Sequence, residues 1–278
     1  MVYFYTEKYF YPWKDVEECI MHDFKKGMSG IKHSGLQRGA AVIFWIIVWQ
    51  IASILIGEEI LLASPIRVCE TLAALVPTKE FWMTAAVSFG RIVSGFILAT
   101  ICGILLSVLA SFCKTVRILL SPLMLLFKAV PVASFIILVL LWTGSRGLSV
   151  VISFLMVLPV IYTNTLEGIL HTDVQLLEMA KVYRLRWYQK FRAIYLPDVL
   201  PYFSSACSIS IGLGFKSGIA AEVIGLPNGS IGERLYQAKI HLSTGEVLAW
   251  TVVIVLLTVC FEYLVKKTLK FAEGRLYR

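Results

Sequence analysis

Six long apolar stretches, separated by short charged segments, run through the chain from residue 39 onward. They cover residues 39–57, 92–112, 129–145, 147–166, 200–224 and 247–261, and the third extends backwards through Lys128 to residue 121. A helix needs about 20 mainly apolar residues to cross the hydrocarbon core of a bilayer, and each stretch comes close to that length. The pattern therefore predicts an all-α membrane protein with six transmembrane helices.

The composition agrees with a membrane protein and argues against other classes. Hydrophobic residues make up 58% of the 278 residues and charged residues only 16%, whereas a soluble domain carries about 25% charged residues. The net charge of +8 does not indicate nucleic-acid binding, because the basic residues flank the apolar stretches and form no run with interleaved aromatics. The six cysteines are scattered without paired spacing, so neither a metal site nor a cofactor is expected.

Lysine and arginine are distributed unequally between the two sides of the membrane. When the stretches alternate from a cytoplasmic start, 18 of these residues fall on the cytoplasmic side and 5 on the opposite side. Cytoplasmic loops carry such an excess, so both termini are expected in the cytoplasm. Residues 1–38 lack the pattern of a signal peptide and are expected to form a cytoplasmic extension. Residues 39–278 are expected to form one six-span domain.

Two of the predicted spans carry small residues at every fourth position. These are Gly95, Ala99, Gly103, Ser107 and Ser111 in the second span, and Ala206, Ser210, Gly214 and Gly218, followed by Glu222, in the fifth. Positions four apart share a helix face, and small residues allow close helix contact in lipid. Such a face is either a packing surface or the wall of a solute pathway, and these two uses can overlap.

Two charged residues inside the fifth span are candidates for a solute pathway. Lys216 and Glu222 are expected to face protein or water, because a charge at the bilayer centre costs about 2.5–3.5 kcal/mol. Lys216 either meets an anionic solute in a pore or pairs with a carboxylate elsewhere. With Ser210, Gly214 and Gly218, these two residues are the candidate pathway residues. Arg91, at the outer edge of the second span, is expected to extend towards the membrane surface.

The segment 171–199, between the fourth and fifth spans, combines basic residues with aromatic ones. Its apolar positions predict two short helices joined by a turn, and Pro197 is expected to end or kink the chain before the fifth span. A helix-turn-helix at the cytoplasmic membrane face is suited to dock a partner protein. The alternative is an amphipathic helix that lies on anionic lipid.

This segment resembles the EAA loop of binding-protein-dependent ABC importer permeases. The residues that match the pattern in type and spacing are Glu178, Ala180, Phe191, Leu196 and Pro197. Leu185 stands where the pattern has a small residue, and Arg184 replaces the usual glycine. Glycine suits a turn with positive φ, and that geometry costs another residue about 1 kcal/mol or more.

The resemblance extends from about residue 61 to the C-terminus. The segments at 62–65, 88–91 and 129–131 are similar to those of the family, and those at 220–225 and 229–232 are similar to the nitrate, sulfonate and taurine branch. It implies a type I importer permease that works as a pair of subunits, a homodimer in the simplest case. Two cytoplasmic ATPases and an external binding protein would complete the importer in a bacterial plasma membrane.

The resemblance implies that a partner subunit, and not this chain, binds ATP, and the sequence agrees because a phosphate-binding motif is missing. No G-x-x-x-x-G-K-[ST] sequence occurs in the chain, so ATP is expected to bind to the partner ATPase. The resemblance gives the loop the role of coupling to that ATPase, with Glu178 near the positive end of its first helix. The branch implies a small anion or a vitamin precursor as solute.

Three alternatives remain at this point. An ATP-independent secondary transporter or channel usually shows an internal repeat, and none is found between the two halves. A membrane enzyme would need a cluster of catalytic polar residues at one membrane face, so no enzyme is expected. A vitamin-type importer subunit would also dock ATPases, but typically through Ala-Arg-Gly motifs, which are absent here.

Overall fold

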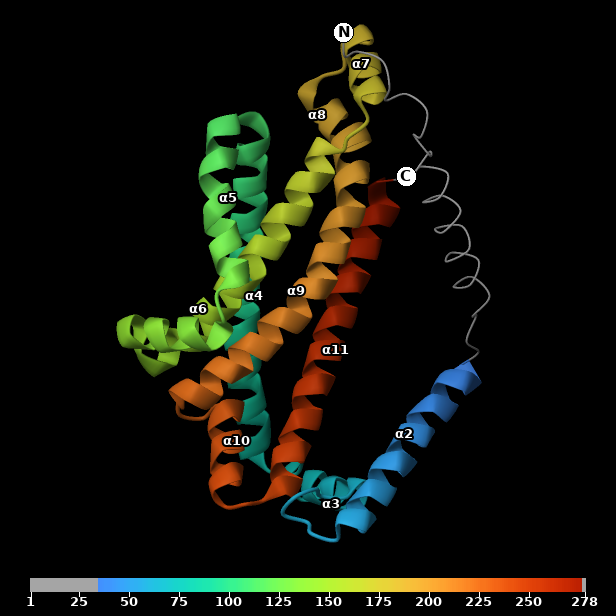
Figure 1. The fold of residues 1–278 in the computed structure, drawn as a ribbon. Helices are drawn as coiled ribbons and strands as arrows, with labels where there is room; N and C mark the ends of the chain where they lie inside the picture. Colours follow the sequence, from blue (N-terminus) through green and yellow to red (C-terminus); the bar gives the residue numbers. More distant parts are fainter. Residues whose placement is uncertain (1–34, 277–278) are drawn as a thin grey trace, which may run out of the picture. The chain divides into compact units, whose positions relative to one another are not determined.

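The computed structural model describes residues 35–276, and every regular element among them is a helix (Figure 1). The chain divides into two compact units between Leu55 and Ile56. The first unit contains α2 (Gly35–Ile56) except for its last residue, and this helix begins four residues before the predicted first span. The rest of the predicted N-terminal extension lies outside the described residues.

The second unit is a bundle of long helices with short helices at its two ends. The long helices are α4 (Lys79–Phe112), α6 (Val132–Leu170), α9 (Leu196–Gly225) and α11 (Thr244–Leu276). The shorter ones are α3 (Pro65–Leu75), α5 (Lys114–Ala129), α7 (Val174–Val182), α8 (Trp187–Lys190), the π-helix η1 (Phe191–Tyr195) and α10 (Ile231–Ile240). Helix α6 packs extensively against both α4 and α9 and forms the centre of the bundle.

The third predicted span is not one straight helix. Helix α5 ends at Ala129, Val130 and Pro131 are extended, and α6 begins at Val132. Proline lacks an N–H and disfavours helical geometry in the residue before it, which explains the break. A second break follows at Gly144, whose φ of 65° and ψ of −178° are accessible essentially to glycine alone. This break lies one residue before Ser145, where the third apolar stretch ends.

Helices α4 and α6 run in the same direction, so the chain must return between them. Gly95 of α4 faces Val150 of α6, and Gly103 faces Ile161 further along both helices. The return path consists of α5 and residues 132–143. Five described helices are long and apolar enough to cross a membrane, and α5 is not among them. The predicted count of six spans is therefore not confirmed.

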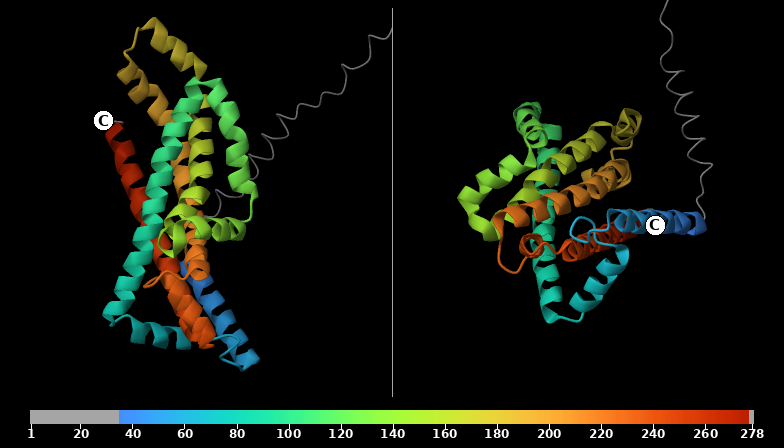
Figure 2. Two further views of the ribbon diagram at one scale, coloured as in Figure 1. Left: turned by 90° about the vertical axis from the view of Figure 1, so that its left-hand side faces the viewer. Right: turned by 60° about the horizontal axis from the view of Figure 1, so that its bottom comes forward.

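The connecting segments of the second unit gather at two opposite ends (Figures 1 and 2). The turn between α4 and α5, the helices α7 and α8, and the end of α11 lie at one end. Helices α3 and α10 lie at the other end. The charge pattern assigned the segment between the second and third predicted spans, the segment between the fourth and fifth, and the C-terminal segment to one side of the membrane. These segments therefore lie at the same end of this unit.

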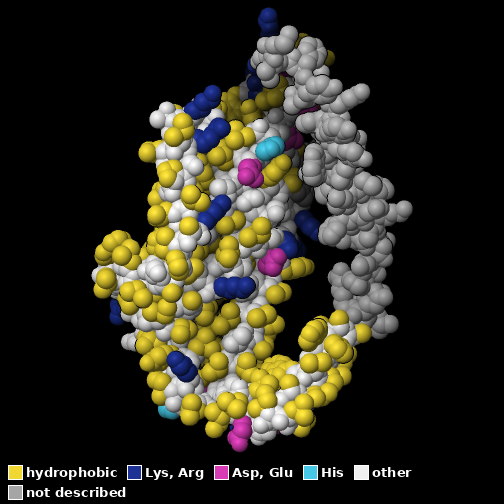
Figure 3. Space-filling model, viewed as in Figure 1, with side chains coloured by type: hydrophobic (Ala, Val, Ile, Leu, Met, Phe, Trp, Pro, Cys, Tyr) yellow, Lys and Arg dark blue, Asp and Glu magenta, His cyan; other side chains and the backbone are white. Residues whose placement is uncertain are grey.

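Apolar side chains cover much of the flanks of the bundle (Figure 3). Large hydrophobic residues stay exposed along the long helices, among them Ile97, Ile101 and Leu105 of α4 and Leu256 and Val259 of α11. This surface suits the hydrocarbon core of a bilayer, where apolar side chains need no cover from water.

Candidate functional site: a buried carboxylate cluster and an exposed helical loop

The small faces of α4 and α9 both pack against α6. A Cβ atom added to Gly95 would lie 2.4 Å from the carbonyl oxygen of Val150, and one added to Gly103 would lie 2.8 Å from Cγ2 of Ile161. On α9, a Cβ at Gly214 would lie 3.1 Å from a methyl group of Val157. Close packing of the bundle thus accounts for both small faces.

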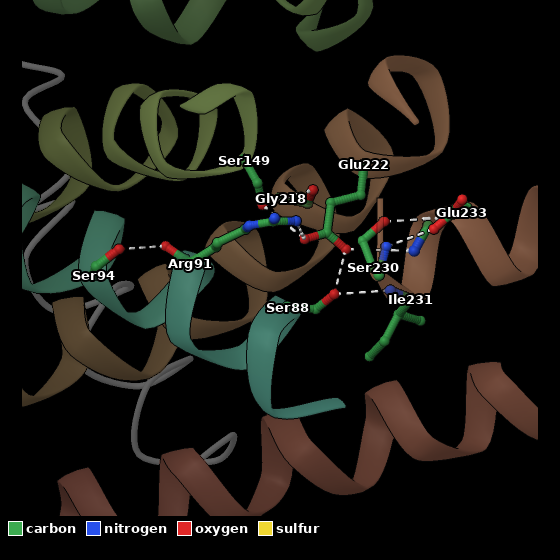
Figure 4. Close-up of polar contacts among 11 residues, drawn as sticks. Ser88, Arg91, Ser94, Ser149, Gly218, Glu222, Ser230, Ile231 and Glu233 are labelled. Atoms are coloured by element: carbon green, nitrogen blue, oxygen red, sulfur yellow. Dashed lines mark hydrogen bonds and ion pairs between the residues drawn. The ribbon is translucent and has the colours of Figure 1, made fainter. Parts of the chain in front are cut away.

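Glu222 lies at the centre of a polar cluster that joins three long helices (Figure 4). Its side chain is fully buried, and its Oε2 atom accepts a hydrogen bond of 2.6 Å from Ser88 of α4. On α6, the hydroxyl of Ser149 lies 3.4 Å from Oε1 of Glu222 and 3.3 Å from the carbonyl oxygen of Gly218. The carboxylate therefore connects α9 to both of its neighbours.

The same cluster holds the start of α10. The backbone N–H of Ile231 donates to Ser88 Oγ at 2.8 Å, and that of Gly232 donates to Glu222 Oε2 at 3.4 Å. A helix N-terminus favours a negative group because its first N–H groups are unpaired. Gly232 allows this approach, since a Cβ there would lie 2.3 Å from the backbone carbonyl carbon of Glu222. Ser88 and Glu222 thus fix α10 onto the bundle.

Arg91 turns inward, and the expectation that it extends to the membrane surface is wrong. Its Nη1 atom lies 3.8 Å from Oε1 of Glu222, and only 20% of its side chain is exposed. The buried carboxylate attracts the guanidinium and so supplies the reason for this orientation. The Glu222 carboxylate is fully buried with Arg91 as its charge partner, and a buried charge of this kind normally requires one.

Lys216 lies on a different face of α9 from the other candidate pathway residues. Ser210, Gly214, Gly218 and Glu222 are buried in the contact between helices, whereas Lys216 is exposed. Within residues 35–276, no carboxylate lies within ion-pair distance of Lys216. Any role of these five residues in solute passage stays a prediction.

The predicted helix-turn-helix forms at one end of the bundle. Asp173 caps α7 by accepting from the N–H of Gln175, and the chain then continues through α8 and η1 into α9. Ala180 and Ile194 are buried and anchor the two arms, while Glu178 and Phe191 are exposed. Leu185, Leu196 and Pro197 are partly buried. The arrangement leaves an acidic and an aromatic side chain available to a partner.

Arg184 adopts the left-handed geometry that the family pattern assigns to glycine. Its φ is 50°, and it ends α7 with two backbone hydrogen bonds, from Leu185 N–H to the Ala180 carbonyl and from Arg184 N–H to the Lys181 carbonyl. This pair of bonds is the Schellman arrangement, which usually has glycine at the left-handed position. The loop therefore keeps the turn of the pattern despite the substitution.

Pro197 does not end the helix. The chain is helical without interruption from Trp187 to Gly225, and the five residues before Leu196 form the π-helix η1. The N–H of Leu196 donates to the carbonyl of Phe191. With this wider turn the helix continues although Pro197 has no backbone N–H to donate. Such π-turns are frequent at functional sites.

An apolar cavity of about 550 Å³ lies between this loop and the bundle. Its walls come from the ends of α4 and α6 and from α7 to α9, including Phe112, Leu177, Trp187, Phe191 and Phe203. The loop is therefore incompletely packed against the bundle.

The chain is similar to known transport proteins. Residues 83–267 match the family described as the binding-protein-dependent transport system inner membrane component. SsuC of Bacillus subtilis, a permease assigned by name to aliphatic sulfonates, is 27% identical over 81% of this chain and 82% of its own. The taurine permease TauC of Escherichia coli is 24% identical over 82% of this chain and 84% of its own. The formylaminopyrimidine permease ThiX of Halalkalibacterium halodurans is 26% identical over 66% of this chain and 73% of its own.

These matches cover the bundle, the Glu222 cluster and the loop between α6 and α9. They also confirm the nitrate, sulfonate and taurine branch that the motifs indicated. The chain thus belongs to the family of binding-protein-dependent transport inner-membrane components, the multi-pass permeases through which bacterial ABC importers carry solutes across the plasma membrane.

Proposed function

We propose that this chain is the transmembrane subunit of an ATP-driven importer and couples to a separate ATPase through residues 171–199. The observation that carries the proposal is the loop itself. Its two arms are anchored by Ala180 and Ile194, and it presents Glu178 and Phe191 at the end of the bundle where α4, α6 and α11 also end. An anchored helix with an exposed aromatic residue is suited to enter a groove on a partner.

The importer needs other subunits. ATP binds to the partner ATPase, because the chain carries no phosphate-binding motif of its own. An external binding protein delivers the solute, and a second copy of this chain completes the pathway as a homodimer. In this assembly α5 and residues 132–143 together form the third membrane crossing along the chain, which brings the total to six. Rocking of the two subunits opens each side of the membrane in turn.

The solute pathway follows the exposed face of α9 that carries Lys216. The opposite, buried face of α9 packs onto the neighbouring helices through Ser210, Gly214, Gly218 and Glu222. A deep lysine without a carboxylate partner favours a small anionic solute, in agreement with relatives named for sulfonates and taurine. A vitamin precursor is the alternative, because another relative is named for formylaminopyrimidine.

The proposed orientation predicts which native cysteines react with a membrane-impermeant maleimide from outside the cell. Cys69 of α3 and Cys113, which follows α4, are both exposed and lie at opposite ends of the unit. In variants that keep only one of them, Cys69 should be labelled in intact spheroplasts and Cys113 only after permeabilisation. Labelling of Cys113 from outside would contradict cytoplasmic placement of the loop end.

The pH dependence of labelling gives a further test at Cys113. The backbone N–H groups at the start of α5, that of Val116 first, lower the pKa of the Cys113 thiol from the ordinary value of 9.0. Because the thiolate is the reactive form, Cys113 should react at lower pH than free N-acetylcysteine in permeabilised cells. A pH profile identical to that of N-acetylcysteine would contradict the lowered pKa.

The coupling role is tested by co-purification of the partner ATPase with the tagged chain. Glu178→Ala and Phe191→Ala should each reduce the bound ATPase at least about tenfold, because central contacts of an interface cost 2 kcal/mol or more when truncated. Arg184→Gly, which keeps the turn, and Lys239→Ala, at the opposite end, are matched controls that should retain the ATPase. Equal recovery with all four variants would overturn the proposal.

A further inference from the structure

Lys128 resembles Lys216 in that it is exposed and has no acidic partner among the described residues. It lies in the last turn of α5, and its ammonium group donates to Oγ1 of Thr163 in α6 at 3.2 Å. The hydroxyl of Thr163 donates in turn to the carbonyl oxygen of Pro159 at 2.7 Å. In the part of the chain that the structure describes, no carboxylate lies within ion-pair distance of Lys128. A neutral hydroxyl therefore holds this cation in place.

Lys128 lies deep along the bundle. It comes fourteen positions after Lys114, where α5 begins at the loop end of the bundle, and a helix of that length extends about 21 Å. Lys216 comes nine positions before Gly225, where α9 ends, which places it about 14 Å from that end of the helix. The hydrocarbon core is about 30 Å thick. Both ammonium groups thus sit at depths where facing lipid would be costly.

The backbone beside Lys128 gives an independent reason to exclude lipid from this face. Val130 and Pro131 leave helical geometry, and Ala129 and Pro131 are exposed. Irregular backbone at membrane depth occurs where it is buried in protein or lines a water-filled cavity. Since this segment is open within the subunit, it faces either water or a second subunit across the pathway.

The two lysines lie at different levels. Helices α6 and α9 run antiparallel, with Val157 beside Gly214 and Gly168 beside Tyr202. Thr163 falls between these levels, so the Lys128 ammonium lies nearer the loop end than Lys216 does. A solute that enters from the end carrying α10 reaches the level of Lys216 first and that of Lys128 second.

We propose that Lys128 is a second anion-binding residue of the solute pathway, positioned by Thr163 one step beyond Lys216. The inference rests on the proposed function, because it assumes that the exposed faces of α5 and α9 border a common path. Two cations at successive depths would each offset part of the cost of bringing an anion into the membrane. Glu167, exposed one turn beyond Thr163 on α6, is the nearest acidic position along that helix.

The test measures the local potential beside Lys128 with a reporter cysteine. The full-length chain, co-expressed with its ATPase, keeps the buried Cys207, has its other cysteines replaced, and carries Ala129→Cys. Membrane vesicles are treated with 2-sulfonatoethyl or 2-(trimethylammonium)ethyl methanethiosulfonate, which carry opposite charges. The quantity compared is the rate of the anionic reagent divided by that of the cationic one. Ala133→Cys, also exposed, is a second reporter if the first variant fails to assemble.

Lys128→Met should lower this ratio roughly tenfold, because one nearby charge acts on the two reagents in opposite directions. Lys128→Arg should preserve it, and Glu167→Gln should not lower it. An unchanged ratio in Lys128→Met, or no reaction of either reporter, would overturn the proposal. The assay needs no ATP hydrolysis. An unchanged ratio together with intact ATPase docking would therefore exclude only the anion-binding role of Lys128. A lowered ratio without ATPase docking would exclude only the ATP-driven function.

Discussion

Gly95→Ala will separate α4 from α6 and lower the melting temperature of the purified protein by roughly 5–10 °C. The new Cβ would lie 2.4 Å from the Val150 carbonyl oxygen and 2.9 Å from Cβ of Ser153, and the first of these atoms belongs to the backbone, which cannot rotate away. Overpacking of this kind costs about 1–3 kcal/mol, and each kcal/mol corresponds to about 2–4 °C in a chain of this size.

Gly90→Ala is the matched control for this prediction. Gly90 lies in the same helix, and a Cβ there would meet nothing within 4 Å. Alanine is favoured over glycine in a helix by about 1 kcal/mol, so this variant should melt at the same temperature as the parent or slightly above it. Melting can be followed by size-exclusion chromatography in detergent after heating. Equal losses in both variants would show that α4 and α6 are not in close contact at Gly95.

Glu222→Gln will destabilise the end of the bundle that carries α10 by about 2–3 kcal/mol. The amide retains the shape of the carboxylate but removes the charge that balances Arg91, whose Nη1 atom has no hydrogen-bond partner among the described residues. The Ser88 hydroxyl and the N–H of Gly232 also lose an ionised acceptor. The melting temperature should therefore fall, and the segment before α10 should become more sensitive to protease.

A double variant separates the charge pair from the hydrogen bonds. Combining Glu222→Gln with Arg91→Gln should restore part of the loss, because no uncompensated buried charge remains. Glu70→Gln is the control, since Glu70 pairs with Arg67 at the surface and exposed ion pairs contribute about 0–1 kcal/mol. If the double variant loses as much as the two single variants combined, Arg91 and Glu222 act independently.

The sequence predicted the helices well and their interruptions poorly. Long apolar stretches are sufficient to locate α4, α6, α9 and α11. The segment 129–145 is mainly apolar, so its composition concealed the break at Pro131, whereas the break at Gly144 lies one residue before the end of this stretch. The same apolar context made Lys128 look like an extension of a span, and its partner Thr163 lies 35 positions away.

The candidate sites differ in how far local pattern determines them. The pattern left the turn geometry at Arg184 open, because arginine replaces the usual glycine there, and the structure shows a left-handed φ. The small faces were predictable, but their neighbour α6 was not, since periodicity does not identify the helix that packs on a face. The bond from Ser88 to Glu222 spans 134 positions, and only the folded bundle brings these residues together.

In the proposed importer, the loop at 171–199 transmits the binding of the external protein at one side of the membrane to an ATPase at the other side. The most direct measurement is ATP hydrolysis in proteoliposomes that contain the full chain and its ATPase, with binding protein added on the outside. We expect binding protein to stimulate hydrolysis with the intact chain, and Phe191→Ala to abolish this stimulation while Ile101→Ala, on the exposed apolar flank of α4, preserves it. Hydrolysis that responds neither to binding protein nor to the Phe191→Ala substitution would exclude coupling through this loop.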